Sequence, residues 1–311
     1  MKKVVACIIS LILFVHVSIP NSKALETSVS EISYQEAIVN YYPETENEEI
    51  VFPTEDLYSV SNGKQSMISY AYTPEENIGE QISPTSVIGG DTRNKVLNPS
   101  VSPYSKIVFI RTFFPNGYTV RSSGVILGPD LVLTCAHSLY VEAYGGWATK
   151  CLVFTDVNGS RPNDSDGVST IKMTIPSAWR TSGSSGSDWG YVITNTAIGN
   201  QKGWMGFGYS PTSYSVNYTI SGYPLNEPYK TSNDNYYMYT ASGKISLSSD
   251  GNMFDYEIDT SEGQSGSPLY TSGQIVYGIH VLGGNHATKI SPTLYNYLVS
   301  AKNEGIEKWS D

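Results

Sequence analysis

The sequence predicts an all-β protein that ends in one helix. Beyond residue 86, the chain of 311 residues contains many short runs of β-branched and aromatic residues, separated by clusters of Gly, Asn, Ser and Pro. No long segment with a 3.6-residue period occurs before the C-terminal end. Many short strands followed by a single helix are typical of antiparallel barrels or of a β-sandwich.

The predicted strands follow one another at short intervals, each bounded by turn residues. They are KIVFIRTFF, SGVILGP, DLVLTCAH, TKCLVFTDV, STIKMTI, GYVIT, VNYTISGYP, YYMYTASGKIS, FDYEIDT and QIVYGIHVL. The final helix is predicted in SPTLYNYLVSAKNEGIEKW. Ser291 is its N-cap, and Pro292 takes the first helical position. Leu294, Leu298 and Val299 form one apolar stripe.

The first 24 residues have the composition of a secretory signal peptide. Two lysines precede an apolar run from Val4 to Ile19, and small residues follow up to Ala24. A membrane anchor is the alternative, but the apolar run is short for a span, which needs about 20 residues. We therefore predict a signal peptide over residues 1–24 and a secreted, extracellular protein.

Acidic residues are concentrated in residues 25–85. This segment has 12 acidic residues and one lysine, Lys64, which leaves a net charge of only −2 for residues 86–311. The segment shows little periodicity, so it is either a solvated linker or a pro-segment removed after export. We predict a pro-segment over 25–85, cleaved near Thr85–Ser86, before a main domain over 86–311. A nearly neutral main domain argues against a nucleic-acid partner, which would need a basic face.

Three cysteines occur in the chain, and Cys7 belongs to the predicted signal peptide. Cys135 and Cys151 remain, and two cysteines in a secreted protein can form a disulfide. Cys135 lies in the apolar run LVLTCAH, where a free cysteine packs as a small core residue. The choice between a bridge and two free thiols stays open.

Three histidines remain after the signal peptide, and histidine is the usual general base near neutral pH. His137 ends the run DLVLTCAH, where a predicted strand enters a polar turn. This position suits a base at the rim of a barrel, although a single histidine at a strand end can also be structural. Asp188 enters an apolar strand from a Gly/Ser loop, and a buried carboxylate needs a partner such as a histidine ring N–H. The alternative, a solvent-facing turn aspartate, fits Asp164 and Asp166 better.

Ser265 lies between two glycines in GQSGSP. The nucleophile turn of α/β-hydrolases, G-x-S-x-G, would need glycine at position 267, where this chain has Ser267. No strand–helix pattern surrounds the serine either. A glycine two residues before the serine lets the main chain turn inward, so the N–H groups of Gly263 and Ser265 can point at one developing oxyanion. The pattern predicts Ser265 as a nucleophile beside an anion pocket.

Three segments now carry a resemblance to a known family. TCAH, SDWGYVI and GQSGSP, in this order, resemble the catalytic segments of chymotrypsin-like serine proteases. The chain is most similar to the secreted bacterial glutamyl endopeptidases, also in SVIGGDTR, ISGYP, DTSEGQSGSP and GIH. The resemblance covers nearly all of residues 86–311.

The resemblance implies two antiparallel six-stranded β-barrels with a C-terminal α-helix and an active site in the cleft between the barrels. It also implies a catalytic triad. His137 corresponds to the general base, Asp188 to the residue that orients it, and Ser265 to the nucleophile. Gly263 and Ser265 correspond to the residues that supply the oxyanion N–H groups.

The same resemblance implies how the substrate is read. Glutamyl endopeptidases bind the substrate glutamate with a threonine and a histidine, which correspond here to Thr260 and His280. A hydroxyl group beside a histidine that can donate a hydrogen bond suits a carboxylate ligand.

Several positions depart from the family pattern. Ser122 and Ser138 lie near places where family members often have cysteines, so that disulfide is expected to be absent. Val281 follows the specificity histidine, where a hydroxyl residue is commoner. Asp259 lies where trypsin-like enzymes place the aspartate that binds Lys or Arg.

The sequence is compatible with four functions. The first is a secreted serine endopeptidase that cleaves after Glu, with Asp weaker. The second is the same fold with a Lys or Arg preference through Asp259. The third is an inert protease-like binding module, which would be expected to lack a triad residue. A zinc site from His280, His286 and a carboxylate would have an unusual ligand spacing.

We predict the first function, with a Ser-His-Asp triad that forms an acyl-enzyme. No cofactor and no metal ion is expected. The partners are protein or peptide substrates, with no nucleic acid and no membrane after the signal is cleaved. The protein is expected to be a monomer.

Overall fold

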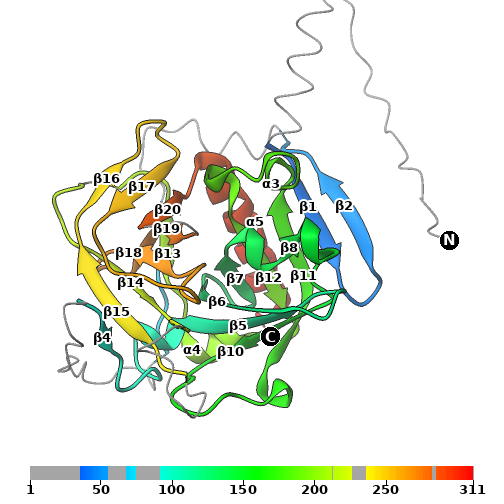
Figure 1. Ribbon diagram of the computed structural model, residues 1–311, viewed down its shortest axis with the longest axis horizontal. Coiled ribbons are helices and arrows are strands. Elements are labelled where there is room, and N and C mark those ends of the chain that lie inside the picture. The colour runs from blue at the N-terminus through cyan, green and yellow to red at the C-terminus, as the bar shows by residue number, and fades with distance from the viewer. Residues whose placement is uncertain are drawn as a thin grey trace, which may run out of the picture.

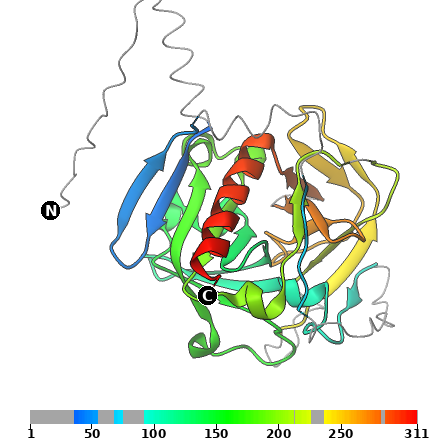
Figure 2. The same ribbon diagram turned by 180° about the vertical axis from the view of Figure 1, so that it is seen from behind.

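The computed structural model describes residues 36–54, 68–74, 92–211, 213–225, 236–281 and 285–310. The predicted signal peptide and the predicted cleavage point at residues 85–86 lie outside these ranges. The described chain forms two β-sheets side by side (Figure 1). One long C-terminal helix lies between them on the face seen from behind (Figure 2).

The first sheet contains a closed barrel of six strands, because β10 pairs both with β5 and with β11. Two further strands, β1 and β2, extend the sheet from β11. In spatial order the strands are β10 (Lys150–Phe154), β5 (Ile107–Phe113), β6 (Thr119–Ile126), β7 (Leu131–Thr134), β12 (Gly190–Thr194), β11 (Val168–Pro176), β1 (Ile38–Tyr42) and β2 (Asn47–Val51).

The second sheet is a half-barrel whose pairings, within the described ranges, leave it open. In spatial order its strands are β16 (Ile245–Leu247), β17 (Met253–Tyr256), β20 (His286–Lys289), β19 (Ile275–His280), β18 (Pro268–Tyr270), β14 (Tyr218–Gly222), β15 (Tyr239–Gly243) and β4 (Asn94–Lys95). Off this path, β13 (Gly206–Gly208) pairs with β19 in parallel and with β3 (Ile68–Ser69). The prediction of an all-β, chymotrypsin-like fold with a C-terminal helix is confirmed.

Shorter elements connect the strands. They are the pair β8 (Tyr140–Val141) and β9 (Gly146–Trp147), the helices α3 (Ser177–Ser182) and α4 (Ile198–Lys202), and the 3₁₀ turns η2 (Tyr104–Lys106), η3 (Ala136–Ser138), η4 (Glu142–Tyr144), η5 (Asp164–Asp166) and η6 (Ser185–Ser187). Three of these, η3, η6 and α3, lie in the connections that carry His137 and Asp188.

The strand β5 explains how the barrel is filled. Its side chains alternate between two buried faces, as the two-residue period of a strand requires. Val108 and Ile110 belong to the hydrophobic cluster inside the first barrel. Ile107 and Phe109 belong to the cluster that joins the two barrels and the terminal helix. A strand buried on both faces reads in sequence as a continuous apolar run, which is what KIVFIRTFF is.

The terminal helix, α5 (Pro292–Lys308), begins as predicted. The Ser291 side chain accepts a hydrogen bond from the Leu294 N–H at 3.1 Å, and Pro292 is the first helical residue. Leu294 and Leu298 are buried in the cluster between the barrels, and Val299 packs against it. Among the described residues, no helix has the length and apolar character needed to cross a membrane.

The acidic segment is part of the sheet structure, which the linker alternative did not anticipate. Strand β1 pairs with β11 in the register Val39↔Ile175, and both Val39 and Ile38 are almost fully buried. Strand β3 pairs with β13 of the second sheet. The described parts of residues 25–85 therefore pack against both barrels, because their apolar residues cover edges that would otherwise be exposed.

Candidate active site

The three residues of the predicted triad come from three different connections. His137 lies in η3, directly after β7, and Asp188 lies between η6 and β12. Both belong to the first barrel. Ser265 lies in the turn before β18 of the second sheet. The site is therefore assembled between the two sheets.

His137 and Asp188 are joined by two hydrogen bonds. The ring Nδ1 of His137 lies 2.7 Å from Oδ2 of Asp188, and the main-chain N–H of His137 donates to Oδ1 at 2.9 Å. The Asp188 side chain is only 3% exposed. The buried carboxylate thus fixes both the main chain and the ring orientation of the histidine.

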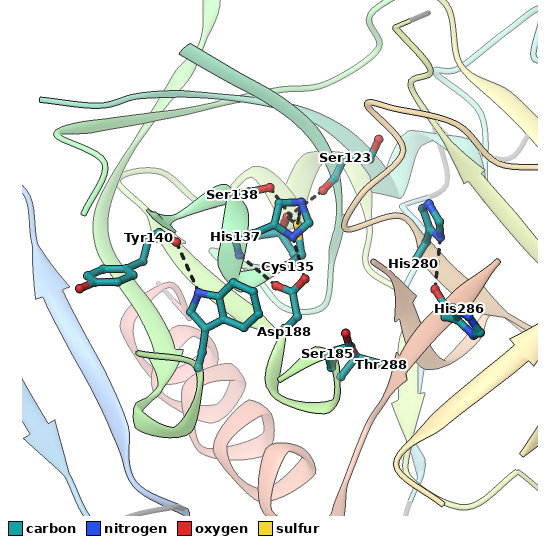
Figure 3. A network of polar contacts seen from close by, with 12 residues as sticks. Ser123, Cys135, His137, Ser138, Tyr140, Ser185, Asp188, His280, His286 and Thr288 are labelled. Atoms are coloured by element: carbon teal, nitrogen blue, oxygen red, sulfur yellow. Dashed lines mark hydrogen bonds and ion pairs between the residues drawn. The ribbon is translucent and has the colours of Figure 1, made fainter. Parts of the chain in front are cut away.

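The other ring nitrogen of His137 contacts a sulfur. Its Nε2 lies 3.5 Å from Sγ of Cys135, which in turn lies 2.8 Å from Oγ of Ser138. Figure 3 shows the imidazole of His137 close to both Cys135 and Asp188. No hydrogen bond joins Ser265 Oγ to His137 in this arrangement of the described residues.

Two neighbours act on the protonation of His137. Burial lowers the pKa of the ring, but Cys135 and Asp188 raise it by more, so the pKa of His137 lies well above the ordinary value for histidine. In the described ranges, these three residues are also the one group whose possible metal ligands lie within 4.8 Å of one another. The sulfur and the carboxylate are bonded to opposite ring nitrogens, so the group is a hydrogen-bonded row with the imidazole in the middle rather than a set of ligands around one centre.

The residues around Ser265 form what we call the nucleophile loop, residues 259–266. The carbonyl groups of residues 262–265 all accept hydrogen bonds. The carbonyls of Glu262 and Gly263 accept from the Leu225 N–H at 2.8 Å and the Ser123 hydroxyl at 3.0 Å. The carbonyls of Gln264 and Ser265 accept from the Ser267 N–H at 2.9 Å and the Ser123 N–H at 2.8 Å.

These bonds decide where the amides of the nucleophile loop point. In a trans peptide the N–H lies opposite the carbonyl of the preceding residue. With the carbonyls of Glu262 and Gln264 fixed, the N–H groups of Gly263 and Ser265 face the other way. Neither donates to a protein acceptor within the described chain. Two amide donors side by side, without acceptors, are the requirement for binding an oxyanion.

Both glycines of the GQSGSP motif are required by this loop. Gly263 has φ +90° and Gly266 has φ +83°, in the left-handed region that L side chains rarely adopt. A Cβ on Gly263 would lie 2.5 Å from the Tyr223 carbonyl oxygen, and one on Gly266 would lie 2.2 Å from that of Ser123. The predicted reason for these glycines, a special main-chain turn at the serine, agrees with this geometry.

His280 ends β19 and is only 5% exposed. Its Nδ1 lies 2.6 Å from the hydroxyl of Tyr256 and 3.2 Å from the carbonyl of His286. Burial lowers the pKa of His280 to about 4. Its main-chain carbonyl accepts from the Gly266 N–H at 2.7 Å, which places β19 directly beside the nucleophile loop. Its Nε2 has no hydrogen-bond partner among the described residues.

The other sequence candidates lie at the ends of the nucleophile loop. Thr260 donates to Oδ1 of Asn285 at 3.2 Å and makes no hydrogen bond to His280. Asp259 accepts two hydrogen bonds from Thr92. His286 is bonded to Asp255 at 2.7 Å, so the two histidines of the zinc alternative have different partners.

Several residues of the site were not predicted from the sequence. Ser123 bonds the nucleophile loop through both its main chain and its side chain, yet it lies in an ordinary strand pattern. Tyr256 orients His280 from a strand in which alternate residues are expected to be buried. Thr288 donates to the carbonyl of Ser185 at 2.6 Å and ties the connection before Asp188 to the second sheet. These are contacts between distant segments, and the sequence patterns carried no signal for them.

Cys135 and Cys151 are both free and buried, which decides the choice between a bridge and two thiols. A cavity of about 580 Å³ adjoins the imidazole and is mostly apolar. Its lining includes His137, Val120, Tyr140, Val141, Tyr144 and Trp179. A cavity beside His137, the predicted base, has the position of a site for a side chain of a bound peptide.

Comparison with known proteins gives consistent matches. The family model described as Trypsin matches residues 93–303 of the chain. The glutamyl endopeptidase of Bacillus licheniformis is 33% identical over 234 residues, which cover 70% of this chain and 69% of that protein. A Bacillus subtilis protein named extracellular metalloprotease is 28% identical over 232 residues, 71% of each chain, and its name describes that protein alone. The solved structure of a Glu endopeptidase in complex with MPD has a TM-score of 0.59 and 27% identity, covering 70% of this chain and 100% of that chain.

The family match spans well over half of the chain and contains His137, Asp188 and Ser265. The sequence relative above 30% identity and the matched structure are both named as glutamyl endopeptidases. The chain therefore belongs to the trypsin family and is a serine endopeptidase related to the bacterial glutamyl endopeptidases.

Proposed function

We propose that this endopeptidase hydrolyses peptide bonds with Ser265 as nucleophile, His137 as general base and Asp188 as the residue that orients the base. The observation that carries the proposal is the outward bonding of the loop carbonyls from Glu262 to Ser265, which leaves two amides for an oxyanion beside the Ser265 hydroxyl. The hydrogen bonds between His137 and Asp188 support the assignment of the base.

In the first step Ser265 Oγ attacks the scissile carbonyl carbon and its proton passes to Nε2 of His137. The carbonyl oxygen becomes negative and is bound by the N–H groups of Gly263 and Ser265. The C–N bond then breaks, the imidazolium gives its proton to the leaving amine, and an ester to Ser265 remains. Water, deprotonated by His137, hydrolyses this acyl-enzyme. Catalytic hydrogen bonds tighten in the substrate complex, so the Ser265–His137 bond forms when substrate is bound.

The preferred substrate residue before the scissile bond is Glu, with Asp weaker. The assignment gives the substrate carboxylate to Thr260 and His280, and two observations support the part of His280. Nε2 of the buried His280 has no hydrogen-bond partner among the described residues, and Nδ1 is bonded to Tyr256. The Tyr256 hydroxyl donates to the His286 carbonyl at 2.9 Å, so it accepts from Nδ1–H of His280, and Nε2 of the neutral ring carries no proton. A bound glutamate carboxylate raises the pKa of the ring and favours a second proton on Nε2, which then donates to the carboxylate.

The remaining assignments concern residues outside the described ranges. The protein is secreted with residues 1–24 as signal peptide, and cleavage near Thr85–Ser86 produces the mature N-terminus. The mature protease acts as a monomer on protein or peptide substrates.

Ser265→Ala tests the mechanism, with Ser267→Ala as a matched control. The Ser267 hydroxyl is buried two residues away and has no hydrogen-bond partner in the part of the chain that the structure describes. Ser265→Ala should lower kcat by several orders of magnitude, because the attacking oxygen is removed, and should end labelling by a fluorophosphonate probe. Ser267→Ala should keep the wild-type kcat and the labelling by the probe. Near wild-type turnover in Ser265→Ala would contradict the mechanism.

A further inference from the structure

The side chain of Gln264 is a buried polar group next to Ser265, and the proposed mechanism gives it no role. Gln264 lies between Gly263 and Ser265 and is only 1% exposed. Its Oε1 accepts a hydrogen bond from Nη1 of Arg93 at 2.9 Å and another from the Ser261 N–H at 3.0 Å. An amide side chain buried at this depth requires such partners, because a buried polar group without a hydrogen bond destabilises the fold.

Arg93 contacts both ends of one short turn in the nucleophile loop. Its side chain is buried, and Nη1 donates also to Oγ of Ser261 at 2.5 Å. The Gln264 N–H donates to the Ser261 carbonyl at 3.0 Å and closes the turn. The guanidinium therefore bonds Ser261 and Gln264, the first and last residues of the turn that contains Gly263.

The segment that carries Arg93 is itself attached to the same loop. Thr92 donates to Oδ2 of Asp259 from its N–H at 2.8 Å and from its hydroxyl at 2.6 Å. Two consecutive residues, Thr92 and Arg93, thus bond the nucleophile loop at three of its residues. Because Thr92 is bonded to Asp259, the main chain of the neighbouring Arg93 is held in place, and its side chain can restrain the turn.

The turn has a main-chain conformation that needs such support. Gly263 has no side chain and has φ +90°, so its peptide units rotate more freely than those of other residues. Glu262 and Gly263 are restrained through their carbonyls, and Arg93 adds the restraint on Gln264. A rotation of either peptide unit would turn one amide away from the oxyanion.

We propose that Arg93 is a positioning residue for the oxyanion site, holding the Ser261–Gln264 turn so that the N–H groups of Gly263 and Ser265 point at the same atom. The proposal rests on the proposed function, in which these amides bind the oxyanion. Arg93 touches no reacting atom, so its effect belongs to the transition state and not to substrate affinity.

The test compares Arg93→Ala and Arg93→Lys with Lys95→Ala as control. Lys95 lies two residues further along the chain, and its Nζ lies 3.1 Å from the centre of the Tyr237 ring. Each variant is assayed for kcat and KM on one peptide amide and for inhibition by a peptide boronic acid and by the product peptide. The boronic acid forms a tetrahedral anion on the nucleophile and mimics the transition state, whereas the product peptide does not.

Loss of a complete oxyanion donor costs about 100- to 1000-fold in kcat, so a misplaced donor in Arg93→Ala should cost about 10- to 100-fold. The Ki of the boronic acid should rise by the same factor. KM and the Ki of the product peptide should change by less than about threefold, since ground-state binding is unaffected. Arg93→Lys should recover part of kcat through one charged donor to Gln264, and Lys95→Ala should behave as wild type.

An unchanged kcat in Arg93→Ala overturns the proposal, and so does an equal loss of affinity for both inhibitors. If Arg93→Ala does not fold, Gln264→Met removes the acceptor with little change in volume and should show the same split between the two inhibitors. Activity in Ser265→Ala would overturn the proposed function instead. The two failures are therefore separated by different variants.

Discussion

Asp259 is bonded twice to Thr92, through Oδ2 to the threonine N–H at 2.8 Å and to its hydroxyl at 2.6 Å. Asp259 was the residue on which a Lys or Arg preference would depend. Its carboxylate instead serves to hold the chain segment that leads to Arg93. A carboxylate with these internal bonds has less capacity for a substrate cation, whereas Nε2 of His280 has no hydrogen-bond partner among the described residues.

We therefore expect cleavage after Glu in peptides that differ only in Glu, Asp, Gln or Lys before the scissile bond. His280→Gln or Thr260→Val should lower kcat/KM for the Glu peptide by about 10- to 100-fold, the value of one charge-assisted hydrogen bond. The Gln peptide should lose much less. Asp259→Asn is the control and should leave the order of preference unchanged. A preference for Lys that disappears in Asp259→Asn would refute the assignment.

The contact between Cys135 and His137 predicts a change in the pH dependence of catalysis. Cys135 raises the pKa of His137, so its removal should lower that pKa. In the proposed mechanism His137 must be unprotonated to act as the base, and its pKa sets the acid limb of kcat/KM. Cys135→Ala should therefore move the acid limb to lower pH. Cys151→Ala, which removes the other buried free thiol, should leave the limb in place. An unmoved limb in Cys135→Ala would show that the sulfur does not act on the base.

Buried His280 predicts a loss of stability in acid. Its folded pKa of about 4 lies below the ordinary value of 6.5, so the unfolded chain binds the proton more tightly. Above pH 6.5 the histidine is neutral in both states and the free energy of unfolding is unaffected. As the pH falls from 6.5 towards 4, the unfolded chain takes up the proton first, and the free energy of unfolding decreases. Between pH 7 and pH 4.5 this decrease should amount to about 2–3 kcal/mol.

Urea unfolding of the Ser265→Ala protein, which avoids self-digestion, measures this dependence. The free energy of unfolding should differ less between pH 7 and pH 4.5 in a protein that also carries His280→Gln. The same change at His286 should have little effect on the difference, because that side chain is 43% exposed. Equal pH dependence with and without His280 would contradict the prediction.

The pairing of β1 with β11 predicts that substitutions in β1 and in β2 affect stability differently. Val39 in β1 is 1% exposed and packs in the hydrophobic cluster that fills the first barrel, whereas Ile50 in the adjacent β2 is 46% exposed. In the full chain, Val39→Asp should destabilise by about 3 kcal/mol or more, because it buries a charge without a partner. Ile50→Asp should stay within about 0.5 kcal/mol of the parent, as surface substitutions do. Equal melting temperatures for the two variants would mean that β1 is not part of the folded sheet.

Local patterns were sufficient to predict much of this protein. Runs of β-branched and aromatic residues bounded by turn residues predicted the strands, and Ser291 followed by Pro292 predicted where the last helix begins. The glycines around Ser265 predicted a special turn, because their φ values depend on local main-chain geometry. The pairing of His137 with Asp188 was expected because a buried carboxylate at a strand entrance needs a donor.

The acidic segment is the clearest case that the sequence left open. Its charge and weak periodicity are compatible with a solvated linker, yet Ile38 and Val39 are buried because the edge of β11 is available to them. Nothing within the segment itself carries that information. The pairing exists only when residues 168–176 have formed a strand.

The sequence by itself determined the strand pattern, the terminal helix, the order of the three proposed triad residues and the need for glycine on either side of Gln264–Ser265. Only the tertiary structure decided that Thr92 donates two hydrogen bonds to Asp259, and that Arg93 and Ser123 hold the nucleophile loop. Main-chain conformation and amphipathic period are properties of neighbouring residues, so they can be read along the chain. Hydrogen bonds between residues more than 100 positions apart depend on how two sheets pack, and no local pattern encodes that distance.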